Sequence, residues 1–132
     1  MKKPLLAILK NESNQDYLSW VRSCENQKGK VDFDVIDITK EDWLKKIKAK
    51  EYKIFLASPP AATSLFKQLF DERVMIISRD LGKIVYPSVK EILLYENKKN
   101  LAYWLEAVGL PMPPTKVFYY KEDAIKFVQK AD

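Results

Sequence analysis

The chain has 132 residues, with 23 Lys and Arg against 18 Asp and Glu, so its formal net charge is +5. It has no histidine and one cysteine, Cys24. These counts exclude Ser-His-Asp and Cys-His nucleophile systems, His-bearing zinc sites, an intrachain disulfide and a CxxC redox pair. The apolar fraction of 47% and the charged fraction of 31% are typical of a globular domain. Any function must therefore be sought in motifs.

The amino terminus carries lysines followed by a short apolar run at residues 5–9, which is similar to the start of a signal peptide. Polar residues 10–14 follow at once, so the run is too short for a signal-peptide core with a cleavage site. No apolar stretch approaches the roughly 18 residues that a membrane span needs. We interpret residues 5–9 as a buried strand and expect a cytoplasmic protein with no membrane partner.

The positive charge is carried almost entirely by lysines, with Arg22, Arg73 and Arg79 as the only arginines. Base readout and bidentate phosphate binding favour arginine in concentrated patches. The densest lysine cluster, residues 45–50, has the pattern of the exposed carboxyl end of a helix, where cations complement the helix dipole. We interpret the charge as solvated surface and expect no nucleic-acid partner.

Strand and helix patterns alternate through a first predicted domain, residues 1–86. The expected strands are residues 5–9, 31–38, 54–57 and 74–77, and the helices between them begin near Ser13, Thr39 and Thr63. Apolar strands that alternate with helices indicate a parallel sheet covered on both faces. The predicted fold class is therefore α/β, a small doubly wound, Rossmann-like domain.

A second region, residues 87–132, has a different pattern of helices separated by stop signals. Ser88-x-x-Glu91 is a capping box for a short helix, and Asn97 caps a second helix that ends at Gly109. A strand over residues 115–120 and a last helix are expected to follow. That helix begins near Lys121 and turns four residues inward: Ala124, Ile125, Phe127 and Val128.

Candidate substrate-binding residues follow from the predicted sheet. Ligands of doubly wound sheets bind beyond the carboxyl ends of the strands, near the point where the strand order reverses. Here that means residues 10–14 and 58–64. The polar residues that we select there are Asn11, Ser13, Ser58 and Thr63. No general base accompanies these hydroxyl groups, so we assign no catalytic residue.

The other sequence features mainly exclude kinds of binding site. The three glycines are far apart, so neither GxGxxG nor a P-loop is present. Asp32, Asp34 and Asp37 lie on one predicted strand, where we favour a solvated strand edge over a metal site. No metal ligand is assigned. Cys24 and the tryptophans are expected to pack in the core.

Residues 96–115, ENKKNLAYWLEAVGLPMPPT, resemble the opening of an ATP-grasp module. In that superfamily an Asp/Asn-Lys pair starts a helix, the helix ends in Gly-hydrophobic-Pro-x-Pro, and a strand follows. Residues 117–119 and 122–127 are similar to the family's next strand and its acidic-Ala-aliphatic helix. The α/β segment upstream resembles the pre-ATP-grasp domain that precedes such modules. The specific part of the resemblance covers residues 86–127.

The resemblance implies an ATP-dependent carboxylate–amine or carboxylate–thiol ligase that works through an acyl phosphate, with ATP and Mg²⁺ as cofactors and a small molecule as substrate. Lys98 matches the basic residue that approaches the nucleotide phosphates in family members, so it is the candidate cofactor-binding residue. A lysine at a helix start suits an anion, because the free N–H groups there also favour negative charge. The alternative for Lys98 is an ordinary exposed helix lysine.

The sequence departs from the family pattern at one point. The family's Gly-rich loop, second lysine, adenine-binding hinge and acidic Mg²⁺ ligands are not found up to Asp132. We therefore expect a severed part of a longer ligase, whose partner is the remainder of the ATP-grasp module. This part is expected to bind no ATP or Mg²⁺ and to be inactive by itself, and homo-oligomerisation is left open. The alternative is a non-enzymatic α/β small-molecule-binding or regulatory module.

Overall fold

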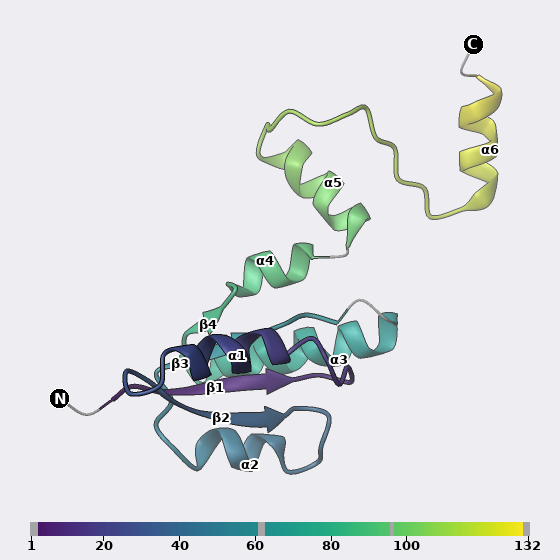
Figure 1. Cartoon of the computed structure of the whole chain (residues 1–132). Coiled ribbons are helices and arrows are strands. Elements are labelled where there is room, and N and C mark those ends of the chain that lie inside the picture. Colours follow the sequence, from purple (N-terminus) through teal and green to yellow (C-terminus); the bar gives the residue numbers. More distant parts are fainter. Residues whose placement is uncertain (1–2, 61–62, 96, 131–132) are drawn as a thin grey trace. The chain divides into compact units, whose positions relative to one another are not determined.

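The computed structural model describes residues 3–60, 63–95 and 97–130, and the chain divides into two compact units, Met1–Tyr95 and Glu96–Asp132 (Figure 1). The first unit alternates strands and helices. Its elements are β1 (Leu5–Lys10), α1 (Leu18–Asn26), β2 (Asp32–Asp37), α2 (Trp43–Lys48), β3 (Ile54–Ala57), α3 (Ser64–Met75), the π-helical turn η1 (Ile76–Asp80), β4 (Val85–Tyr86) and α4 (Val89–Leu94). The second unit contains α5 (Lys98–Ala107) and α6 (Lys121–Gln129).

The four strands of the first unit form one all-parallel sheet in the order β2-β1-β3-β4. Figure 1 shows β1 and β2 running in the same direction. The chain moves from β1 to β2 on one side and then returns past β1 to β3 on the other. This reversal places the switch point between the carboxyl ends of β1 and β3, where Leu9 is in register with Ala57.

Both faces of the sheet are covered. This follows from β1, whose neighbouring residues belong to two different clusters of buried apolar side chains. Ala7 and Leu9 lie in the larger cluster, to which α2, α3, η1 and α4 contribute buried side chains. Ile8 lies in the smaller cluster with Cys24 of α1 and Leu56 of β3. Opposite faces of one strand are thus buried under different helices, as side-chain alternation requires. The predicted α/β fold with a parallel sheet is confirmed.

The predicted strand at residues 74–77 is wrong, because α3 continues to Met75 and η1 follows it. Phe70, Val74 and Ile77 are all buried in the larger cluster. Their spacing of four and then three residues puts them on one face of a helical segment. The fourth strand is β4, which pairs with β3 through Phe55 and Val85.

The helix α5 of the second unit begins and ends as predicted, although the unit itself begins at residue 96 and not at residue 87. Asn97 caps α5 by accepting a hydrogen bond from the Asn100 backbone N–H at 3.2 Å. Gly109 follows the helix with φ of 69°, the left-handed conformation that ends helices and that glycine adopts without strain. Among the described residues, none of the helices combines the length and the apolar character that crossing a membrane requires.

Two expectations for the second unit are wrong. Residues 115–120 form no strand, since no described segment pairs with them and an isolated strand leaves its backbone polar groups without partners. The apolar side of α6 is also not inward, because Ile125, Phe127 and Val128 are 45%, 44% and 69% exposed. Within this unit Phe127 contacts the ring of Phe118, with centroids 5.3 Å apart.

Candidate functional site

Asn11 joins the two loops that follow β1 and β3. Its side chain is 3% exposed. Its Nδ2 donates to the Ser58 backbone oxygen at 2.7 Å, and its Oδ1 accepts from the Ser13 backbone N–H at 2.7 Å. A buried amide that is paired at both ends fixes the separation of the groups it bonds. Asn11 thereby holds the two sides of the switch point together.

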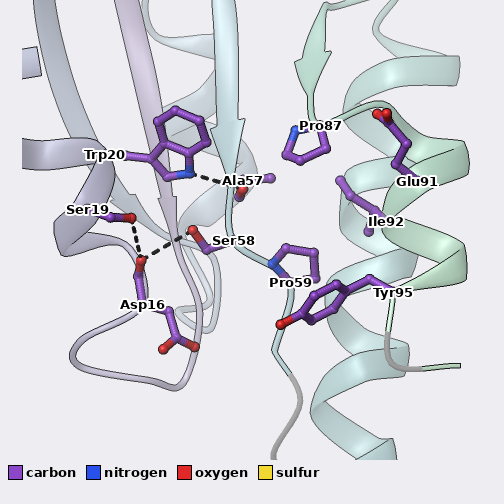
Figure 2. Close-up of a pocket in the computed structure, with 10 residues that line it drawn as sticks. All are labelled: Asp16, Ser19, Trp20, Ala57, Ser58, Pro59, Pro87, Glu91, Ile92 and Tyr95. Atoms are coloured by element: carbon purple, nitrogen blue, oxygen red, sulfur yellow. Dashed lines mark hydrogen bonds between the residues drawn. The ribbon is translucent and has the colours of Figure 1, made fainter. Parts of the chain in front are cut away.

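A cavity of about 510 Å³ opens beside these loops, and we call it the switch-point cavity. It is formed by the start of α1, the carboxyl end of β3 and the helix α4 (Figure 2). Its lining residues are Asp16, Ser19, Trp20, Ala57, Ser58, Pro59, Pro87, Glu91, Ile92 and Tyr95. A concave site at the carboxyl edge of a parallel sheet is where α/β domains usually bind ligands.

Two hydrogen bonds join the start of α1 to the end of β3 along one wall of the cavity, and a third lies within the start of α1. Figure 2 shows the hydroxyl groups of Ser19 and Ser58 directed at the backbone oxygen of Asp16, to which they donate at 3.2 and 3.3 Å. The indole Nε1 of Trp20 donates to the Ala57 backbone oxygen at 3.1 Å. Trp20 therefore has a fixed orientation while its ring lines the cavity.

The opposite wall is α4, whose amino end carries the predicted capping box. Ser88 Oγ accepts from the Glu91 backbone N–H, and the Glu91 carboxylate accepts from the Ser88 N–H and Oγ at 2.7 Å each. These bonds favour the charged carboxylate, so they hold the pKa of Glu91 below its usual range. Figure 2 shows Tyr95 extending from the end of this helix towards Pro59.

The structure separates the four predicted substrate-binding residues. Ser58 lines the switch-point cavity, whereas Asn11, Ser13 and Thr63 are not among its lining residues. Ser13 Oγ instead accepts from the Gln15 and Asp16 N–H groups at 3.1 and 3.2 Å, and Thr63 caps α3. These three shape the loops around the site through hydrogen bonds of their own.

The remaining lining residues escaped selection because their local patterns have ordinary explanations. Trp20 has core spacing on α1, and Glu91 completes a capping box. Asp16 belongs to the predicted start of the first helix near Ser13, and Tyr95 stands beside no motif. Only Trp20 and Asp16 could have been connected with the site from the sequence, because both come shortly after the loop that follows the first strand. No local sequence pattern connects α4 with that loop, because their proximity depends on the order of the strands in the sheet.

Lys98 belongs to the second unit, where it is the first residue of α5 and its side chain is exposed. This is the helix start that the resemblance predicts. Asn97, which precedes it, is the N-cap. A phosphate-binding role for Lys98 stays a prediction.

The aspartates of β2 have protein partners. Asp34 accepts hydrogen bonds from Lys50 Nζ at 2.7 Å and from the Tyr52 hydroxyl at 2.8 Å. The bond from Lys50 is the main cause of a pKa of Asp34 below its usual range. Asp37 accepts from Thr39 Oγ1 at 2.6 Å. Within the described residues, no three His, Cys, Asp or Glu side chains gather as a metal site.

Comparisons with protein-family models, with curated proteins and with solved structures give no match for this chain. Its function therefore has to be argued from the chemistry of its own residues. The switch-point cavity is the feature on which that argument can be based.

Proposed function

We propose that the first unit binds a small molecule in the switch-point cavity, and that it serves as the substrate-binding part of an ATP-grasp type ligase. The observation that carries the proposal is the position of this cavity at the switch point of a parallel sheet. Its walls combine apolar surface with a few polar groups, which is the usual character of a small-molecule site.

The ligase part of the proposal is supported by the second unit. An Asn-Lys pair at the start of α5, followed by Gly109 and Pro111, repeats the order of signals that opens ATP-grasp modules. The described residues offer no Mg²⁺ ligand set. We therefore assign neither a metal nor a catalytic step to them.

Binding can be measured with ¹H–¹⁵N spectra of the indole groups. Trp20 lines the cavity, while Trp43 lies in the larger core cluster and Trp104 lies on α5. In a screen of small amines, carboxylates and alcohols, a cavity ligand should shift the Trp20 signal and leave that of Trp43 in place. A ligand set that moves only Trp104, or nothing, would contradict the proposal.

A matched pair of variants locates the ligand. Ser19 lines the cavity, and Ser23 follows one turn later on the same helix and is not a lining residue. Both hydroxyl groups make similar bonds to the preceding turn, at 3.2 and 2.9 Å. Ser19→Phe should weaken binding at least about tenfold by filling the cavity, whereas Ser23→Phe should not change it. Equal effects of the two variants would place the ligand elsewhere.

The ligase role is tested on the natural gene product. We expect its reading frame to continue past Asp132 into a glycine-rich loop and closely spaced acidic residues. In that protein Lys98→Ala should raise the KM for ATP about tenfold, because one charged hydrogen bond to phosphate is lost. Lys99→Ala is the control, since Lys99 Nζ lies over the Tyr119 ring at 5.5 Å. A stop codon after Asp132 would favour a non-enzymatic binding module.

A further inference from the structure

The charge of the switch-point cavity is opposite to that of the chain. Asp16 and Glu91 line it, and none of the described Lys or Arg residues does, although the chain carries a net charge of +5. Lys67 donates to the backbone oxygen of Ile92 at 3.0 Å, but it is paired with Asp71 on its own helix. The lining of the cavity is therefore anionic.

Both carboxylates keep acceptor capacity for a ligand. The two bonds that Ser88 donates end on Oε2 of Glu91, so Oε1 takes part in neither. At Asp16 the backbone oxygen, and not the carboxylate, accepts from Ser19 and Ser58. The helix cap thus occupies Oε2 of Glu91 and leaves Oε1 for a ligand, and the loop contacts of Asp16 involve its backbone oxygen only.

The rest of the wall suits an apolar body. Trp20 and Tyr95 present aromatic rings, and Pro59, Pro87 and Ile92 add aliphatic surface. The faces of aromatic rings also attract cations, which adds to the effect of the carboxylates. An anionic ligand would meet two negative groups in this cavity, and no described Lys or Arg is among the lining residues that could offset them.

We propose that the switch-point cavity takes a small molecule that joins an ammonium group to an apolar or aromatic body. This inference rests on the proposed function, because it names the ligand class of the same cavity. In a carboxylate–amine ligase such a ligand is the acceptor amine. The ammonium group would donate hydrogen bonds to Asp16 or Glu91 while the body lies against Trp20 and Tyr95.

The test compares three probes of similar size and different charge: 2-phenylethylamine, 2-phenylethanol and 3-phenylpropanoate. Each is titrated into the full chain while the Trp20 indole signal is followed. We expect the amine to bind about fivefold more tightly than the alcohol, and the carboxylate to bind more weakly than either. The advantage of the amine should shrink as NaCl is added, because salt screens charge interactions.

Charge-removing variants identify the partners of the ammonium group. Glu91→Gln keeps an acceptor for the capping box, and Asp16→Asn leaves the backbone oxygen in place, so both should stay folded. Each is expected to weaken binding of 2-phenylethylamine about threefold to fivefold and to leave binding of 2-phenylethanol unchanged. Glu25→Gln, near the carboxyl end of α1 and outside the cavity lining, removes the same charge and should have no effect.

The outcomes separate this inference from the proposed function. If the alcohol or the carboxylate binds as tightly as the amine, and Ser19→Phe still blocks it, the cavity is a ligand site and the ammonium assignment is wrong. If Glu25→Gln weakens amine binding as much as the cavity variants do, the effect is one of net charge and the assignment again fails. If no probe shifts the Trp20 signal, both the inference and the cavity site are overturned.

Discussion

The two units of the chain bury their apolar residues to very different extents. In the first unit a parallel sheet separates two clusters, and Phe55, Phe70 and Ile77 are at most 1% exposed. In the described part of the second unit Ala102 is the only buried hydrophobic residue, and α6 has none. Both units contain well-formed helices, so helical pattern alone does not indicate a core. A sheet whose two faces are both covered does indicate a core.

The largest expected effect contrasts Phe55→Ala with Phe127→Ala. Removing a fully buried ring should lower the free energy of unfolding by about 3–5 kcal/mol, much of the stability of a small domain. Phe127 is 44% exposed, so its removal should change the same quantity by less than about 0.5 kcal/mol. Urea denaturation followed by circular dichroism measures both. Equal losses would mean that the second unit shares one cooperative core with the first.

A pair of asparagines gives a smaller contrast. Asn11→Ala leaves the partly buried Ser58 carbonyl and Ser13 N–H without their partner, which should cost about 2 kcal/mol of global stability. Asn97→Ala removes a helix cap worth about 1 kcal/mol, with an effect confined to the first turn of α5. Amide hydrogen exchange at Asn100 should therefore accelerate in Asn97→Ala and not in Asn11→Ala. Acceleration throughout the sheet on Asn97→Ala would contradict this separation.

The smallest expected effect depends on pH and concerns Asp34. Its pKa is lower in the folded chain than in the unfolded one, because Lys50 and Tyr52 donate to the carboxylate. The stability that it contributes is thus present above its ordinary pKa, about 4, and is lost as pH falls through the folded value.

Asp34→Asn should therefore lower the free energy of unfolding at pH 7 by about 1 kcal/mol, since a charge-assisted hydrogen bond is lost. Near pH 3 the difference from the unaltered chain should shrink. Urea midpoints at the two pH values measure it, and amide shifts of residues 98–129 serve as the internal reference for the second unit. A difference that grows in acid would have the wrong sign.

Several elements of both units could be predicted because their signals are local. The strand at Ile54–Ala57, the capping box at Ser88 and the ends of α5 are each specified by a few neighbouring residues. The error at residues 74–77 has a physical reason. Four apolar residues in a row fit a buried strand and a buried helical face equally well, and the choice depends on the preceding helix.

The candidate site could be predicted only in part. The location followed from the general rule for parallel sheets, which selected the loops containing Asn11 and Ser58. The cavity itself needs α4, which reaches that edge only because β4 pairs with β3. Glu91 and Tyr95 could not be connected with Trp20 from the sequence, since the strand order is set by long-range packing.

The edges of the sheet have a consequence for how the chain behaves at high concentration. One edge strand, β2, carries Asp32, Asp34 and Asp37, and the other, β4, is two residues long. Charged or very short edges offer a poor template to a strand from another molecule. Self-association by adding a strand from another molecule is therefore disfavoured at both edges of this sheet.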